Sequence, residues 1–292
     1  MNFFISIWHY IQFFWNTIFF HPILNLFILF YKIAGNNFGV SIIILTILIR
    51  ILLWPTLKSQ ILSSIKMQKV QPKLKEIQKK YKSDLMKLRE EQMKLFKEEG
   101  VSPYGSCLSL IVQLPFLWAI YEAILMISGH SASFINKIMY IPFLKYPASY
   151  HYNLNFFLIG NISKDASEMH IFTLVAIPYI VLSLLVGYSQ YLVTKAMLPS
   201  TKEKIAEEST KLEIKEGKKG KKESAGMDPE VIGSIMSKQM LYFMPVFLVI
   251  ISLGIIGPIP AALSIYWVVQ SLFMYFQAKI ISKTTKVSIK EV

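Results

Sequence analysis

The chain has 292 residues, of which 53% are hydrophobic and 14% aromatic, which is too apolar for an ordinary soluble domain and indicates a polytopic membrane protein. The net charge is +13, and the one cysteine, Cys107, excludes an internal disulfide. The chain lacks a phosphate-binding loop and the motifs H-E-x-x-H and G-x-S-x-G, which signal metal-dependent and serine hydrolysis. We therefore expect a protein that is not an enzyme, with no catalytic residues, no metal and no cofactor.

The N-terminal region, residues 1–37, is expected to form apolar or amphipathic helices on the outer face of the membrane. Residues 3–20 are long enough to span the bilayer but contain polar interruptions, so a sixth span there stays an open alternative. The next helix has Pro22 in its first turn and ends at Gly35. We expect this second helix to lie in the interface.

Five apolar stretches follow that are long enough, or nearly so, to cross about 30 Å of hydrocarbon as helices. The fold class is therefore all-α, a five-helix transmembrane bundle. We place the spans at residues 38–57, 106–128, 171–195, 237–256 and 258–280.

The charges of the connecting segments predict the orientation of the chain. Segment 58–104 holds 12 Lys and Arg, segment 195–238 holds 10, the tail from Lys279 holds 4, and segment 129–170 holds only three Lys. By the positive-inside rule, the first three segments lie in the cytoplasm and the last lies outside. The N-terminus is then outside and the C-terminus inside.

Segment 58–104 is predicted to form a cytoplasmic helical hairpin that breaks at residues 82–84. The seam of its first helix follows 3-4-3-4 spacing, and Pro72 should kink or interrupt that helix. Two readings of its charges stay open: a solvated helix surface, or contact with ribosome, lipid head groups or nascent chain. The seam residues are Met67, Val70, Leu74, Ile77 and Tyr81, facing Leu85, Leu88 and Leu95.

The other connecting segments have different compositions. Residues 196–236 are mainly polar and charged, which predicts a disordered basic cytoplasmic linker, and residues 281–292 form a short cytoplasmic tail. The outer loop, residues 129–170, is rich in Phe and Tyr, which suit the head-group zone.

Arg50 lies inside the first predicted span, where a charge is costly. The 13 Leu, Ile, Val and Phe residues of 38–57 contribute about 4–8 kcal/mol toward insertion, against a cost of about 2.5–3.5 kcal/mol for a central arginine. The span therefore tolerates Arg50. The side chain either snorkels to the interface or faces a polar interior.

Polar and small residues form stripes on several predicted spans. Each stripe alone fits helix packing, but together with Arg50 they favour a shared hydrated cavity. The stripes are Thr46 with Arg50; Ser106, Ser109 and Gln113; Ser183, Gly187, Gln190 and Thr194; and Ser264, Trp267 and Ser271, with Gln270 and Gln277.

Glu122 is the one acidic residue within a predicted span, and it is the alternative partner for Arg50. Its depth is about 24 Å from the cytoplasmic end of its helix, against about 10 Å for Arg50. The depths do not match well, so we place Glu122 near the outer interface.

Several of these stretches together resemble the YidC family of membrane protein insertases, the bacterial branch of the Oxa superfamily. The resemblance covers about 38–122 and 171–280 in order, with Ser102-Pro103 and "PIPAAL" as departures from the usual pattern. The stretches are "GVSIIILTILIRILLWPTLKSQ", "MQKVQPKLKEIQKKY", "LFKEEGVSPYGSCLSLIVQLPFLWAIY", "MSKQMLYFMPVFLVI" and "LSIYWVVQSLF".

The resemblance implies two sets of site residues. Arg50 would be the groove arginine, with Thr46, Gln190 and Trp267 at matching groove positions, and Gln113 completes the candidate groove set. The second and fourth spans would form an apolar slide for a client helix, and methionine suits it because it packs against varied partners. Slide candidates are Phe116, Leu117, Ile120, Met240, Phe243, Met244 and Phe247.

The predicted function is that of a membrane protein insertase or chaperone, with a groove open to cytoplasm and lipid, in the bacterial inner membrane. Its expected partners are nascent membrane proteins and membrane lipid, with the ribosome and the Sec channel as further candidates and no DNA. The alternative is a small-solute or anion transporter that uses Arg50. The odd number of spans and the absence of a visible repeat argue against it.

Overall fold

The computed structural model describes residues 2–81, 84–100, 105–164, 174–197 and 242–290. These residues are almost entirely helical, which confirms an all-α polytopic membrane protein. The long helices are α1 (Asn2–Trp15), α2 (His21–Ile33), α3 (Phe38–Leu52), α4 (Trp54–Lys80), α5 (Leu85–Glu98), α6 (Gly105–Gly129), α8 (Ile177–Met197), Tyr242–Ser252 and α11 (Ala261–Lys290).

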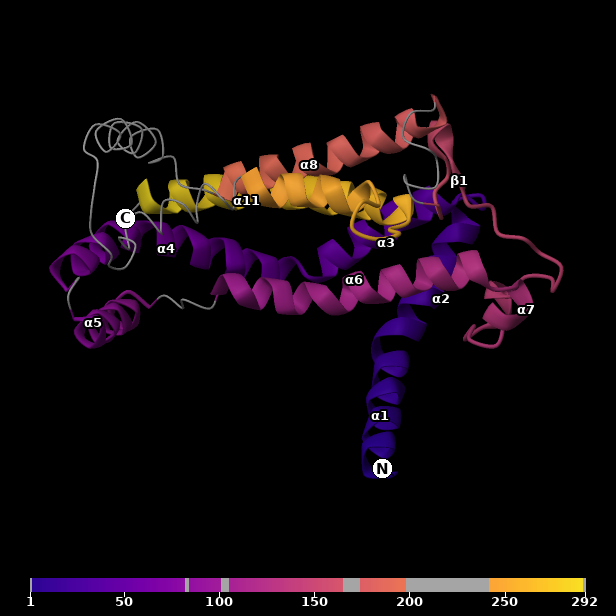
Figure 1. The fold of residues 1–292 in the computed structure, drawn as a ribbon, viewed down its shortest axis with the longest axis horizontal. Coiled ribbons are helices and arrows are strands. Elements are labelled where there is room, and N and C mark those ends of the chain that lie inside the picture. Colours follow the sequence, from indigo (N-terminus) through magenta and orange to yellow (C-terminus); the bar gives the residue numbers. More distant parts are fainter. Residues whose placement is uncertain (1, 82–83, 101–104, 165–173, 198–241, 291–292) are drawn as a thin grey trace, which may run out of the picture.

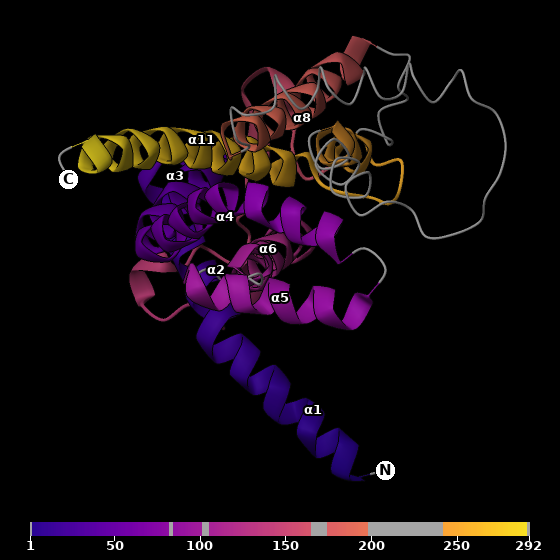
Figure 2. The ribbon, with the colours of Figure 1, turned by 90° about the vertical axis from the view of Figure 1, so that its left-hand side faces the viewer.

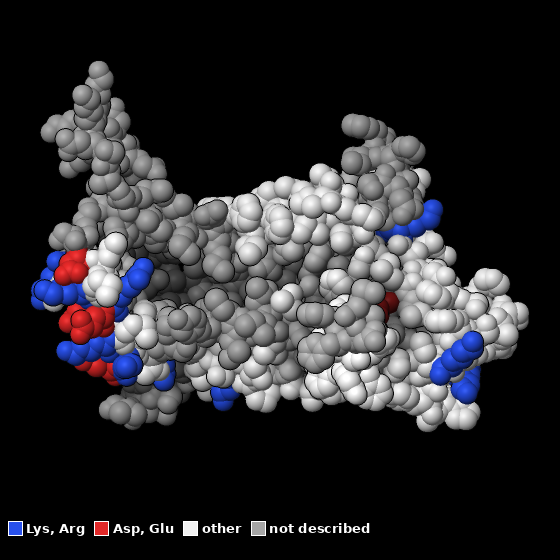
Figure 3. Space-filling view, turned by 60° about the horizontal axis from the view of Figure 1, so that its bottom comes forward, with Lys and Arg blue, Asp and Glu red and all other residues white. Residues whose placement is uncertain are grey.

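Within the part of the chain that the structure describes, three helices are long and apolar enough to cross a membrane, and a bent pair makes a fourth candidate. Helices α6, α8 and α11 run along the long axis of the molecule (Figure 1). On the face shown in Figure 3, the coloured charged side chains lie mostly toward the two ends. The candidates are Ser6–Ile33, Val112–Gly129, Leu174–Met197 and the pair Phe38–Leu52 with Trp54–Ser63.

The predicted span 38–57 is bent. Helix α3 starts at the cap Asn37, whose side chain accepts a hydrogen bond from the Val40 amide at 3.0 Å. It ends at Leu52 with Leu53 as its C-cap, and α4 then leaves at 64°. Pro55 has no backbone N–H and favours the start of a new helix, so the bend has a local cause. The predicted bounds of the five spans and of the segments between them stay a prediction.

The hairpin of α4 and α5 has a small core of its own, as its sequence pattern predicts. Val70 and Leu95 are buried against each other, with Met67, Leu74 and Ile77 beside them. Helix α4 continues through Pro72 without interruption. Leu85 is 65% exposed, contrary to the prediction, because it is the first residue of α5 and follows the cap Asp84.

The N-terminal helices form one continuous helical segment. A π-helix, η1 (Asn16–Phe20), joins α1 to α2 without a break. Both ribbon views show α1 projecting away from the bundle (Figure 1, Figure 2). Helix α2 is instead packed into the main core, where Leu24, Phe27 and Ile28 are fully buried.

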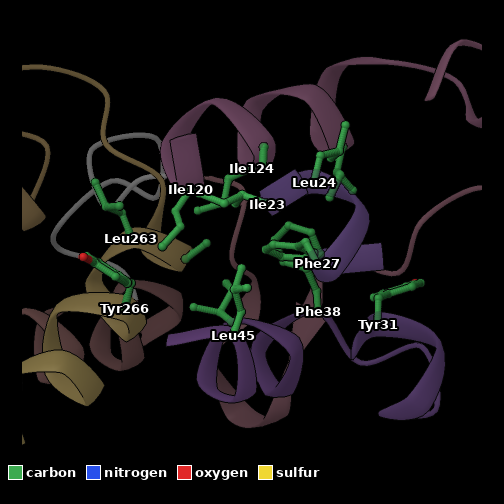
Figure 4. Close-up of a cluster of buried hydrophobic side chains, with 14 of the residues drawn as sticks. Ile23, Leu24, Phe27, Tyr31, Phe38, Leu45, Ile120, Ile124, Leu263 and Tyr266 are labelled. Carbon is green, nitrogen blue, oxygen red and sulfur yellow. The ribbon is translucent and has the colours of Figure 1, made fainter. Parts of the chain in front are cut away.

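The main core joins α2, α3, α6 and α11 (Figure 4). Phe27 and Phe38 pack with ring centroids 5.0 Å apart, and Leu45, Ile120 and Ile124 are fully buried around them. The Tyr266 hydroxyl lies at the edge of this cluster and points away from it (Figure 4). The apolar core therefore borders a polar region.

The described part of the outer loop, up to residue 164, packs on α2 and α3. It contains α7 (Ala132–Ile135), η2 (Pro142–Leu144), η3 (Phe157–Ile159) and an antiparallel pair of β1 (Asn155–Phe156) and β2 (Gly160–Asn161). Gly39 allows close packing, because a Cβ there would lie 2.1 Å from the Phe156 ring. The segment η5 (Leu174–Ala176) leads into α8.

A tyrosine cluster fixes this loop to α2. Tyr146 and Tyr150 stack at 4.2 Å, and Tyr152 packs edge-on against Tyr31 at 5.6 Å. Lys32 lies 4.5 Å from the centroid of the Tyr146 ring. These tyrosines pack against protein, whereas Tyr140, Phe143 and Phe157 are exposed.

Candidate functional site

Arg50 lies in the last turn of α3, one turn before the bend. Its side chain is 2% exposed, which makes it the largest fully buried side chain in the part of the chain that the structure describes. Its guanidinium donates a 2.7 Å hydrogen bond to Oε1 of Gln113 on α6. Burial excludes the snorkelling interpretation and favours a polar interior position.

Gln113 links the arginine to α11. Its amide nitrogen donates to Oε1 of Gln270 at 2.8 Å and also to the Tyr266 hydroxyl. The Tyr266 hydroxyl is in addition close enough to interact with the Arg50 guanidinium. We call Arg50, Gln113, Tyr266 and Gln270 the polar network, and it joins α3, α6 and α11.

The partners of Arg50 in the polar network are neutral. Among the residues that the structure describes, no carboxylate forms a salt bridge with Arg50. Glu122 instead accepts a 2.9 Å hydrogen bond from the Trp15 indole, so the alternative Arg50–Glu122 pair is not formed. The hydrogen bonds stabilise the guanidinium but do not cancel its positive charge, and no described carboxylate does so.

The other predicted groove residues lie in separate contacts. Thr46 is buried and donates to the Ile42 carbonyl at 2.6 Å, within its own helix. Gln190 on α8 accepts a 3.2 Å hydrogen bond from Ser271 on α11. Trp267 is partly buried against the main core. Among the described residues, Gln113 is therefore hydrogen-bonded to Arg50, whereas Thr46 and Gln190 bond elsewhere.

The predicted slide residues differ in their exposure. Phe243 and Met244 are 51% and 41% exposed, and Phe247 stacks on Phe243 at 5.5 Å. Phe116 and Leu117 are partly buried, and Ile120 is fully buried in the main core. Met240 lies outside the described residues.

Tyr266 was not among the predicted groove residues. It lies four residues before Gln270, so the two share a face of α11. That spacing was visible in the sequence, but a tyrosine within an apolar stretch reads equally well as a packing residue. The expectation of a hydrated cavity around Arg50 also differs from this structure, because the guanidinium is almost fully buried and neighbouring side chains supply its hydrogen bonds.

Taken together, the fold and site define a polytopic helical membrane protein with an arginine buried where three helices meet, hydrogen-bonded to a neutral side chain. Residues 29–288 match the family described as 60Kd inner membrane protein. The chain therefore belongs to the YidC family.

Relatives of this chain carry names that agree with the family. The chain is 30% identical over 273 residues to "Membrane protein insertase YidC" of Oceanobacillus iheyensis, covering 92% of this chain and 84% of that protein. It is 29% identical to "Membrane protein insertase MisCA" of Bacillus subtilis, covering 92% and 79%. It is 30% identical to "Membrane protein insertase YidC 1" of Lactococcus lactis, covering 87% and 71%.

Proposed function

We propose that this chain acts as a membrane protein insertase that receives polar segments of nascent membrane proteins at the polar network. The single observation that carries the mechanism is a buried guanidinium with neutral hydrogen-bond partners. In a medium of low dielectric constant such a charge attracts an acidic group more strongly than it would in water. Arg50 is therefore the group that draws acidic residues of a client into the bundle.

The polar network lowers the cost of moving a polar client segment part of the way across the membrane. Burying polar groups without hydrogen bonds is costly, and Gln113, Tyr266 and Gln270 offer donors and acceptors. Transfer of the client's apolar helix into lipid then drives the remaining step. No covalent bond is made or broken, so the proposed function is not enzymatic and needs no nucleotide, metal or cofactor.

Access to Arg50 requires a shift of the side chains that cover it, since it is 2% exposed. Gln113 is the natural candidate, because a rotation of its side chain away from Arg50 frees the guanidinium for a client carboxylate. The groove would open to the cytoplasm and to lipid, next to the bend between α3 and α4. Phe243 and Met244, which are already exposed, would supply the apolar slide together with Phe116 and Leu117.

The proposed orientation follows from charge. The basic hairpin and the C-terminus would lie in the cytoplasm of a bacterial cell and the N-terminus outside its inner membrane. The hairpin would then be available to the ribosome or the Sec channel.

Purified protein in liposomes tests the proposed function. A single-span client released from ribosomes should integrate into the bilayer without leakage of small anions. Anion flux without client integration would instead indicate the alternative transporter function.

Variants of Arg50 test the role of its charge. Arg50→Lys should keep most of the insertion of clients with acidic tails, and Arg50→Ala should lose about tenfold or more of it, the effect of one hydrogen-bonded charge. If Arg50→Ala inserts acidic-tailed clients as well as the parent protein does, the electrostatic step is wrong.

A further inference from the structure

The N-terminal segment touches α6 at two points. The Trp15 indole nitrogen donates a 2.9 Å hydrogen bond to Oε2 of Glu122. The Phe19 ring packs edge-on against Phe116, with centroids 6.0 Å apart, and Trp15 stacks on Phe19 at 5.4 Å. Together these contacts attach the end of α1 and the π-helix η1 to the middle of α6.

The rest of α1 has few contacts. Its apolar side chains are exposed on several sides, and both ribbon views show it leaving the bundle (Figure 1, Figure 2). The contact with α6 therefore depends mainly on Trp15 and on the residues of η1. Phe20, also in η1, is buried in the main core, so only the contacts of Trp15 and Phe19 with α6 are open to exchange. The exposed residues are Ile7, Trp8, Tyr10, Ile11, Phe13 and Phe14.

The π-helix η1 lies within this contact. A π-turn adds a residue to the helical repeat and changes the direction in which later side chains point, and such turns are frequent at functional positions. Here η1 begins directly after Trp15 and contains Phe19. Trp15 and Phe19 also precede residue 29, where the family match begins, so the family match does not account for this contact.

The contact covers a surface to which the proposed function assigns a role. Phe116 is a slide residue, and Glu122 lies about 9 Å further along α6. Glu122 is a carboxylate within an apolar helix, where an unpaired polar group is costly. Among the hydrogen bonds between described side chains, the Trp15 indole supplies the one donor to Glu122.

We propose that Trp15 and Phe19 form an internal strap that occupies the client surface of α6, and that a client helix replaces the strap. The inference rests on the proposed function. Phe19 stands in for an apolar client side chain against Phe116, and Trp15 stands in for a client donor to Glu122. The preferred client is therefore an apolar helix that carries an indole or hydroxyl donor.

The first test locks the strap. Cysteines replace Phe19 and Phe116 in a Cys107→Ser background, and a short bis-maleimide with a reducible disulfide joins them. Client insertion in liposomes should fall at least tenfold in the locked protein and recover after reduction in the same sample. Equal insertion before and after reduction overturns the strap, whereas a parent protein that inserts no client at all contradicts the proposed function instead.

The second test leaves Phe116 intact. Trp15→Phe removes the donor and keeps an aromatic ring, and Trp8→Phe is the matched control because Trp8 is 60% exposed. With a client that lacks a polar donor, Trp15→Phe should raise the initial insertion rate severalfold over Trp8→Phe.

A pair of clients tests the donor preference. One client carries a tryptophan in the middle of its helix and the other carries phenylalanine at the same position. The parent protein should insert the tryptophan client severalfold faster, and Glu122→Leu should abolish that difference. Equal rates for the two tryptophan variants, or a client preference that survives Glu122→Leu, contradict the proposal.

Discussion

At Arg50 two opposing effects meet within one side chain. Burial of a guanidinium costs several kcal/mol when its donors are unpaired. The hydrogen bond to Gln113 at 2.7 Å offsets part of that cost, because bonds to charged groups contribute about 1.5–3 kcal/mol each. The neutral Gln113 acceptor binds one of these donors without cancelling the charge, and this distinction separates a binding residue from a structural ion pair.

Tyr152 shows the opposite situation in the outer loop. Its hydroxyl is buried and has no hydrogen-bond partner among the described residues. Tyr152→Phe removes this unsatisfied group and should raise the free energy of unfolding by about 1 kcal/mol in thermal denaturation. Tyr179→Phe is the contrasting control, because the Tyr179 hydroxyl donates to the Asn161 carbonyl at 2.7 Å and its loss should destabilise. A destabilised Tyr152→Phe would contradict this reading of the loop.

The same residue predicts a dependence on alkaline pH. Burial, followed by the influence of Tyr150, raises the pKa of Tyr152 from 10.0 to about 12. The folded state thus favours the neutral phenol, and this contribution to stability is complete below pH 10 and is lost as the pH rises through about 12. Stability measured between these pH values should fall less in Tyr152→Phe than in the parent.

For individual residues, the sequence predicts the polar character and the spacing of side chains better than it predicts their hydrogen-bond partners. The polar character of Gln113 and Gln270 and the poor match in depth between Arg50 and Glu122 are readable from spacing. The bond from Trp15 to Glu122 is not, because it joins residues 107 positions apart. Thr46 illustrates a further limit, since a hydroxyl on a predicted polar stripe can bond to its own helix.

At the scale of elements, α8 and the helix Tyr242–Ser252 approach each other closely at one glycine. A Cβ on Gly187 would lie 2.4 Å from the Val249 side chain and 3.2 Å from the Pro245 carbonyl oxygen. Such overlap forces side chains or backbone to shift. Gly187 therefore sets the distance between α8 and the helix that carries Phe243 and Met244.

Gly187→Ala should lower the free energy of unfolding by about 1–3 kcal/mol, because the two helices must move apart. Gly129→Ala is a suitable control, since a Cβ there meets nothing within 4 Å. Thermal unfolding of both variants in detergent measures the difference. Equal melting temperatures would show that the two helices are not in close contact in solution.

The bend between α3 and α4 illustrates what element-level prediction misses. Residues 38–57 form one apolar run in the sequence. A hydropathy profile does not show where the helix axis changes direction within that run. Pro55 gives a local signal for the bend, and α11 supports it, since the Gln277 side chain donates to the Trp54 carbonyl at 3.4 Å and the Phe273 ring packs edge-on against Trp54. Tertiary contacts of this kind cannot be read from a single segment.

At the scale of the whole molecule, the distribution of charge predicts how the protein crosses the membrane. Cysteines introduced singly at Ser133 and Lys87 in a Cys107→Ser background test the orientation in intact spheroplasts. Both positions are exposed, so their accessibility depends on the side of the membrane rather than on burial. A membrane-impermeant maleimide should label the cysteine at 133 and spare the cysteine at 87 until the cells are lysed, and the reverse pattern would invert the proposed topology.

The most direct test of the central claim is to neutralise Arg50 without removing it. Gln113→Glu places a carboxylate within hydrogen-bonding distance of the guanidinium, and Gln113→Met is the neutral control. Insertion into liposomes is measured for two clients that differ only in an acidic or a neutral tail. We expect the parent and Gln113→Met to favour the acidic tail and Gln113→Glu to lose that preference; a Gln113→Glu protein that retains the full preference would contradict the account.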